Sequence, residues 1–103
     1  MWNEVADPSY SSDPSKIFVF GSNLDGRHGK GAALWAVQNR GARYGQGFGE
    51  QGMSFAIPTK GRGKSLPILP LDIIANYVKL FIEEARCNPE VEYELTPIGC
   101  GLA

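Results

Sequence analysis

The sequence lacks a long apolar run and has few cysteines and histidines. No apolar stretch approaches the roughly 20 residues that a transmembrane helix needs, and residues 1–4 have neither the basic flank nor the apolar stretch of a signal peptide. We therefore expect a cytoplasmic protein without a membrane partner. The two cysteines, Cys87 and Cys100, have no His or Cys neighbour at metal-ligand spacing, which predicts reduced structural thiols and no metal or cofactor.

The chain also lacks a strong net charge. A value of −1 argues against a dedicated nucleic-acid protein, but the charges are unevenly placed. Residues 26–64 contain Glu50 as their only acid and seven basic side chains, at positions 27, 30, 40, 43, 60, 62 and 64. A local field of this sign attracts phosphate. The alternative is a solvated basic surface, balanced by acids folded against it.

The length and composition indicate one small globular domain. The chain has 103 residues, 43% of them hydrophobic, and 13 glycines. That length allows a single core, and so many glycines indicate backbone that turns tightly or approaches other groups closely. Residues 1–15 are polar and show no periodicity, which predicts an extended N-terminal arm. Residues 16–103 are then one domain.

The first half of this domain predicts a strand, a glycine loop and a helix. Residues 17–20 form a short, continuous β-rich run, typical of a strand buried on both faces. The small and polar residues 21–31 predict a loop. Residues 32–40 then indicate a helix that is closed by Gly41 in the C′ position.

The second half predicts an ordered glycine-rich loop over 41–54, a strand over 55–58 and a third strand over 93–98. Between these strands, apolar residues recur at helical spacing from 71 to 87. The order β-α-β-α-β predicts an α/β fold with a parallel or mixed sheet flanked by helices. Each glycine-rich or basic loop follows a strand, so we expect these loops to meet at the carboxyl edge of the sheet, where such folds bind ligands.

The loop before the first helix is the main candidate for an anion site. Residues 26–33 place backbone N–H groups at a helix N-terminus, where the helix dipole favours an anion. The loop completes neither a Walker A pattern nor G-x-G-x-x-G, so a merely tight turn stays open as the alternative.

Single side chains carry weaker signals. His28, the only histidine, is interpreted as a surface residue because no second group is identifiable to orient it as a base. Asn23 and Asp25 either cap a turn or touch a ligand, and Trp35 is assigned to the core. Lys60 directly follows a buried strand and would meet phosphate or act as a nucleophile, the alternative being a solvated loop lysine.

Four segments together resemble a known family. These are residues 19–24, 29–33, 56–60 and 96–102, which read VFGSNL, GKGAA, AIPTK and TPIGCGL. They look like small phage and bacterial proteins related to macro domains, nearest to the terminal ADP-ribose glycohydrolase and DNA ADP-ribosyl glycohydrolase antitoxin type. The resemblance runs from about residue 16 to 103 and implies a three-layer α/β fold.

The resemblance also implies an ADP-ribose pocket. The first glycine loop would lie near the ribose and diphosphate, and the Gly-Cys-Gly loop on the opposite side of the diphosphate. In the glycohydrolase type, the lysine after the second strand forms a covalent adduct with the sugar, and Lys60 matches it. The expected ligand-binding residues are Gly21, Ser22, Asn23, Gly29, Lys30, Gly31, Ala32, Thr59, Gly99, Cys100, Gly101 and Leu102.

Two departures from the family pattern bear on activity and assembly. Ala103 stands where the glycohydrolase type has an aspartate, and Asp25 is the candidate substitute acid or base. The helix that follows the Gly-Cys-Gly loop in macro domains is also missing. We expect either a naturally minimal version completed by a second copy, hence a homodimer, or a truncated chain. A sheet face left uncovered would be an apolar patch.

Three hypotheses of function follow. The first is binding of ADP-ribose or a related nucleotide with release of ADP-ribose through Lys60, the target being an ADP-ribosylated protein or nucleic acid. The second is a non-catalytic, phage-type protein that sequesters a nucleotide. The third is a nucleic-acid accessory protein that uses the basic surface, whose affinity would fall steeply with salt.

Overall fold

The protein folds into a mixed four-stranded sheet with one helix on each face. The computed structural model describes residues 15–29, 31–63 and 67–96. Its elements follow the order β1 (Ile17–Asn23), α1 (Gly31–Asn39), β2 (Gly49–Gln51), β3 (Ser54–Lys60), α2 (Leu71–Cys87) and β4 (Tyr93–Leu95). The strand order is β2-β3-β1-β4, and β1 is parallel to both β3 and β4, whereas β2 is antiparallel to β3. The predicted α/β class is confirmed.

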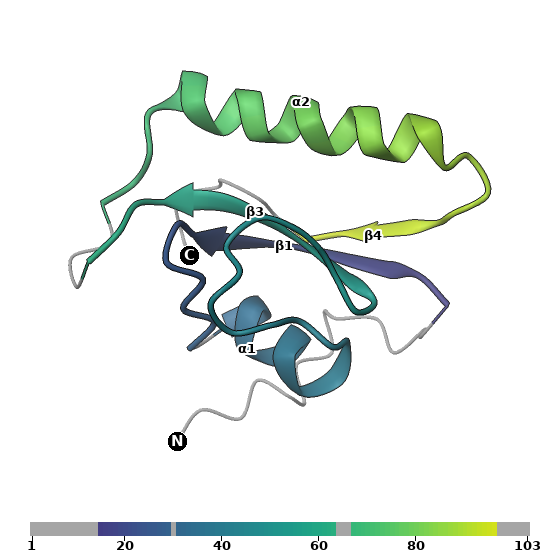
Figure 1. Ribbon diagram of the computed structural model, residues 1–103, viewed down its shortest axis with the longest axis horizontal. Helices are drawn as coiled ribbons and strands as arrows, with labels where there is room; N and C mark the ends of the chain where they lie inside the picture. Colours follow the sequence, from purple (N-terminus) through teal and green to yellow (C-terminus); the bar gives the residue numbers. More distant parts are fainter. Residues whose placement is uncertain (1–14, 30, 64–66, 97–103) are drawn as a thin grey trace.

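The two central strands, β1 and β3, are covered on both faces. Residues 17–20 of β1 and 54–59 of β3 are buried, as the continuous apolar runs predict. Phe18, Phe20 and Ala56 pack with α1 on one face, while Val19 and Ile57 pack with α2 on the other. Figure 1 shows the two helices on opposite sides of the sheet. The molecule therefore has three layers.

The first strand is longer than predicted. The expected loop from Gly21 onward is wrong for its first three residues, because β1 continues to Asn23. Gly21 pairs with Ile57 and Ser22 with Pro58, and the register shifts only between Ser22 and Asn23. Pairing with β3 thus overrides the weak β-propensity of glycine and asparagine.

The first helix matches its prediction closely. It covers Gly31–Asn39, and Gly41 follows with a φ of 74°, a conformation that glycine adopts without strain. Trp35 is 5% exposed, its ring centroid lies 4.7 Å from that of Phe18, and the guanidinium of Arg40 lies 4.7 Å from the Trp35 ring centroid. Trp35 is therefore a core residue, as expected.

The predicted loop over residues 41–54 contains a strand that the sequence did not indicate. β2 and β3 form a hairpin in which Gln51 pairs with Ser54. Gly52, with a φ of 60°, makes the tight turn, and a Cβ there would lie 2.6 Å from the carbonyl oxygen of Gly41. A three-residue strand that begins with glycine has too little periodicity to stand out in the sequence.

The second helix is confirmed in its predicted bounds, Leu71–Cys87. It buries Ile74 and Phe81 against the sheet, and Phe81 stacks edge-on against Phe55 and Tyr93 at 5.0 and 5.2 Å. Burial of such a side chain contributes roughly 1.5–3 kcal/mol. β4 ends at Leu95, and the predicted continuation at 97–98 lies outside the described residues.

In the described ranges, no helix is long and apolar enough to cross a membrane. Across the same part of the chain, no cluster of three or more His, Cys, Asp or Glu side chains is arranged to hold a metal ion. The predicted arm up to residue 14 and the final loop, 99–103, lie outside the part that the structure describes.

Candidate functional site at the carboxyl edge of the sheet

The loops after β1 and β3 meet at one edge of the sheet, as their order in the sequence predicts. Asn23 at the end of β1 is in register with Lys60 at the end of β3, and the backbone N–H of Leu24 donates to the carbonyl of Lys60 at 3.0 Å. The N-terminus of α1 follows the first loop. The third expected component, Gly99, Cys100, Gly101 and Leu102, lies outside the described residues, as does Lys30.

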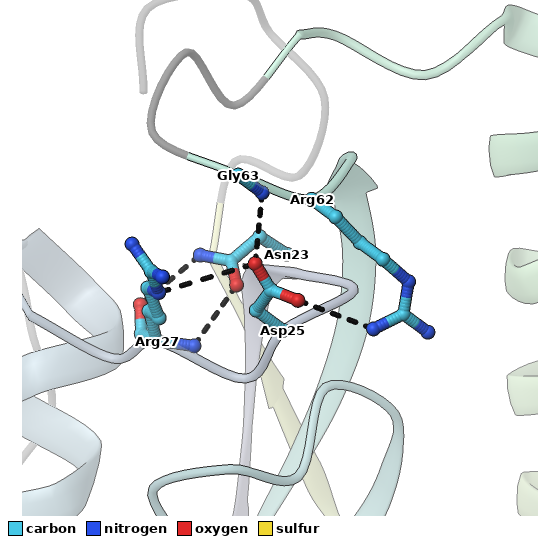
Figure 2. Close-up of polar contacts among 5 residues, drawn as sticks. All are labelled: Asn23, Asp25, Arg27, Arg62 and Gly63. Carbon is cyan, nitrogen blue, oxygen red and sulfur yellow. Dashed lines mark hydrogen bonds and ion pairs between the residues drawn. The ribbon is translucent and has the colours of Figure 1, made fainter.

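Asn23 shapes the first loop. Its side-chain amide donates to the carbonyl of Arg27 at 3.0 Å, and its Oδ1 accepts the backbone N–H of Arg27 at 2.9 Å. Asn23 is buried. Of the two roles considered for it, turn capping is therefore the one that the structure shows, and Figure 2 displays the resulting closed turn.

Asp25 ties the first loop to the loop after β3. Its carboxylate accepts from Arg62 Nη1 at 3.1 Å and from the backbone N–H of Gly63 at 2.9 Å, and Arg27 Nε lies 3.9 Å from Oδ2 (Figure 2). The Gly63 hydrogen bond, aided by the two guanidiniums and opposed by partial desolvation, lowers the pKa of Asp25. Arg27 and Arg62 were absent from the expected site residues, although both belong to the basic segment 26–64.

The hydroxyls of Ser22 and Thr59 are used inside the protein. Ser22 Oγ donates to the carbonyl of Gly47, and Thr59 Oγ1 donates to the carbonyl of Ser22 at 3.4 Å. Both residues are buried. Gly21, in the β1 ladder opposite Ile57, is likewise part of the sheet. These residues belong to the strands β1 and β3, not to the loops that follow them.

A Cβ added to Gly29 or Gly31, before the first turn of α1, would meet no atom of the described residues within 4 Å, and Gly31 has a φ of 65°. The first N–H groups of a helix, here from Gly31 and Ala32 onward, have no partner within the helix and favour an anion. Lys60, half-buried at the end of β3, completes this edge.

A second glycine-rich segment, residues 45–47, packs against the first loop. Gly26 packs against the backbone of Gly45 and Gln46, and Gly47 packs against the carbonyl of Asn23, so that a Cβ at Gly26 or Gly47 would overlap backbone atoms. The backbone N–H of Gly45 also donates to Gly26 at 2.7 Å. The abundance of glycine in residues 41–49 was visible in the sequence, but its partner was not.

The interpretation of His28 as a surface residue is wrong. His28 is 1% exposed, and its Nε2 lies 3.0 Å from the carbonyl of Gln46 and 3.2 Å from Oε1 of Gln51. Both neighbours are acceptors, and Gln51 Oε1 also accepts the backbone N–H of Arg43, so Nε2 carries the proton. Burial lowers the pKa of His28, against hydrogen bonds that raise it. The imidazole thus fastens one glycine segment to the other.

A groove of about 380 Å³ lies elsewhere, between α2 and the β2 side of the sheet. It contains none of the expected site residues. Its walls are Phe48, Gly49, Glu50, Phe55, Leu80, Glu83, Glu84 and Cys87. Three glutamates at one groove repel phosphate, so the carboxyl edge, not this groove, is the candidate site for an anionic ligand.

Comparison with protein-family models, with curated proteins and with solved structures gave no match to this chain. The macro-domain resemblance accordingly stays a prediction that rests on the four sequence segments.

Proposed function

We propose that the protein binds ADP-ribose or a related phosphate-bearing nucleotide at the carboxyl edge of β1 and β3. The observation that carries this proposal is the convergence at that edge of the N-terminus of α1, the cations Arg27 and Arg62, and Lys60. In parallel α/β sheets, ligands bind beyond the carboxyl ends of the strands. The segments that resemble macro domains flank these loops: residues 19–24 and 29–33 lie on either side of the loop after β1, and residues 56–60 precede the loop after β3.

The polarity of the edge suits a diphosphate. Backbone N–H groups at the start of a helix and nearby guanidiniums bind phosphate oxygens through charge-assisted hydrogen bonds. No atom of the described part of the chain fills the space at Gly29 and Gly31, so a ligand oxygen can approach the backbone there. Tyr44 is exposed, and its ring centroid lies 6.2 Å from that of His28 in the loop after β1.

The state of Asp25 favours binding without turnover over hydrolysis. A general base works best when its pKa lies near the working pH, but the pKa of Asp25 is lowered and its carboxylate already has the partners Arg62 and Gly63. Within the proposal, release of ADP-ribose would depend on Lys60. The second candidate is a non-catalytic protein that sequesters the nucleotide at the same site, and the state of Asp25 is the observation that favours it.

The geometry supports the nucleic-acid hypothesis less well. Arg40, one of the seven basic residues of segment 26–64, is buried and packs on Trp35. The basic surface available to a polyanion is smaller than the sequence suggests. We rank this hypothesis third.

Calorimetric titration with ADP-ribose, at low and high salt and with AMP as the comparison ligand, tests the proposal. Saturable binding that prefers ADP-ribose and persists at high salt is the expected result, whereas no binding by a folded sample contradicts it. Lys60→Ala then separates the two candidates. Loss of turnover with retained binding assigns catalysis to Lys60, and saturable binding without turnover by the unmodified protein identifies a sequestering function. The matched control is Lys79→Ala, which removes an exposed lysine on α2.

A further inference from the structure

The strongest polar cluster at the carboxyl edge has an acid at its centre. Asp25 accepts hydrogen bonds from Arg62 Nη1 and from the backbone N–H of Gly63, and it lies 3.9 Å from Arg27 Nε. Figure 2 shows these three groups around the carboxylate, and they come from two separate loops. One anion thus holds two cations and a backbone N–H together.

This arrangement has the donor chemistry that a phosphate group would use. Guanidiniums and backbone N–H groups are the usual protein donors to phosphate oxygens, and a carboxylate offers the same acceptor oxygens with one negative charge. The side chain of Asp25 is 23% exposed, whereas those of Arg27 and Arg62 are 49% and 69% exposed. The cations therefore face solvent, and a dissolved anion can reach them.

We propose that Asp25 is an internal competitor for the ligand's phosphate: its carboxylate occupies the cluster of Arg27, Arg62 and Gly63 N–H, and a phosphate must displace it to bind there. This inference rests on the proposed function, since it concerns regulation of the same edge. In the empty protein, Asp25 closes the loop after β3 onto the loop after β1. On binding, the phosphate takes over the donors, and the carboxylate turns out into solvent.

The competitor role predicts the opposite sign from a structural tether. If Asp25 only held the loops in place, its removal would loosen the edge and weaken binding. As a competitor, its removal frees the donors of Arg62 and Gly63, releases Arg27 from its ion pair and takes away a negative charge that repels the incoming phosphate. Two unit charges about 4 Å apart near a protein surface interact strongly enough for a tenfold effect.

Asp25→Asn is the decisive variant because the amide is isosteric and its Oδ1 can still accept from Gly63. Inorganic pyrophosphate is the probe, titrated calorimetrically into the full chain. We expect Asp25→Asn to bind pyrophosphate about tenfold more tightly than the unmodified protein, and the double variant Asp25→Asn/Arg62→Gln to lose most of that gain. Glu92→Gln makes the same charge change at the opposite edge, where the Glu92 carbonyl accepts the N–H of Ile17, and should leave the affinity unchanged.

Equal or weaker pyrophosphate binding by Asp25→Asn, in a sample whose thermal unfolding shows that it is folded, overturns the competitor role. An equal gain in Glu92→Gln also overturns it, because the effect would then be one of net charge. The same variants titrated with ADP-ribose distinguish the two proposals. A pyrophosphate gain without preference for ADP-ribose over pyrophosphate supports the competitor and contradicts the proposed nucleotide function.

Discussion

The two loops that meet at the carboxyl edge are held by different forces. The loop after β1, residues 24–29, is fixed from inside the protein by buried His28 and by close backbone contact with Gly45 and Gly47. Residues 62–63 of the loop after β3 contact it through the partly exposed carboxylate of Asp25. Buried contacts cost much to break, whereas exposed ion pairs contribute about 0–1 kcal/mol. The exposed contact between the two loops therefore contributes less stability than the packing that fixes the loop after β1.

The largest expected effect comes from removing the imidazole that fixes the loop after β1. His28→Ala leaves a cavity beside Phe20, whose ring centroid lies 5.2 Å from that of His28, and deprives Gln46 and Gln51 of a donor. We expect a loss of about 2–4 kcal/mol in the free energy of unfolding, measured by urea denaturation. A loss below about 1 kcal/mol would show that the two glycine segments hold each other without His28.

The protonation of His28 gives a smaller effect of known sign. Burial lowers the pKa of His28 in the folded protein below its ordinary value of 6.5. As the pH falls below 6.5, the unfolded chain therefore binds more protons than the folded protein does. The contribution of His28 to the free energy of unfolding is therefore fully present above about pH 6.5. It declines as the pH falls toward the lowered pKa, by at most about 1.4 kcal/mol per pH unit.

Urea unfolding at pH 7.5 and 5.5 checks this dependence. The chain has one histidine, and histidine is the side chain that ordinarily titrates in this range. His28→Gln should remove most of the difference between the two pH values. An equal difference in that variant would assign the pH dependence to carboxyl groups instead.

The smallest effect on stability is expected at the exposed contact between Arg62 and Asp25. Arg62 is 69% exposed, so Arg62→Ala should change the free energy of unfolding by less than about 1 kcal/mol. Amide hydrogen exchange should nevertheless become faster at Gly63, because its acceptor Asp25 loses the guanidinium that helps to position it. Unchanged exchange at Gly63 would mean that the backbone hydrogen bond alone holds this contact.

Sequence reasoning reached the elements that carry strong patterns. The apolar run at 17–20, the helical spacing at 71–87 and Gly41 after the first helix each predicted what the structure contains. It missed β2 and the extension of β1 to Asn23, because both depend on pairing with β3. Such pairing is a tertiary effect that local propensity does not record.

The sequence predicted that the loops after β1 and β3 meet at one edge, but not the contacts that their side chains make. Strand order alone brought Asn23 and Lys60 to one edge, and the structure agrees. The inward roles of Ser22 and His28 depend on contacts with Gly47, Gln46 and Gln51, 18 to 25 residues away in the chain. No spacing rule connects such partners, so only the fold reveals which polar side chains are structural.

The most direct test of the central claim is a two-dimensional amide NMR titration of the ¹⁵N-labelled protein with ADP-ribose. We predict saturable shift changes at the amides of residues 24–29, 31–32 and 60–63, with none around the acidic groove formed by Glu50, Glu83 and Glu84. Shift changes confined to that groove, or none at any amide of a folded sample, would contradict a nucleotide site at the carboxyl edge.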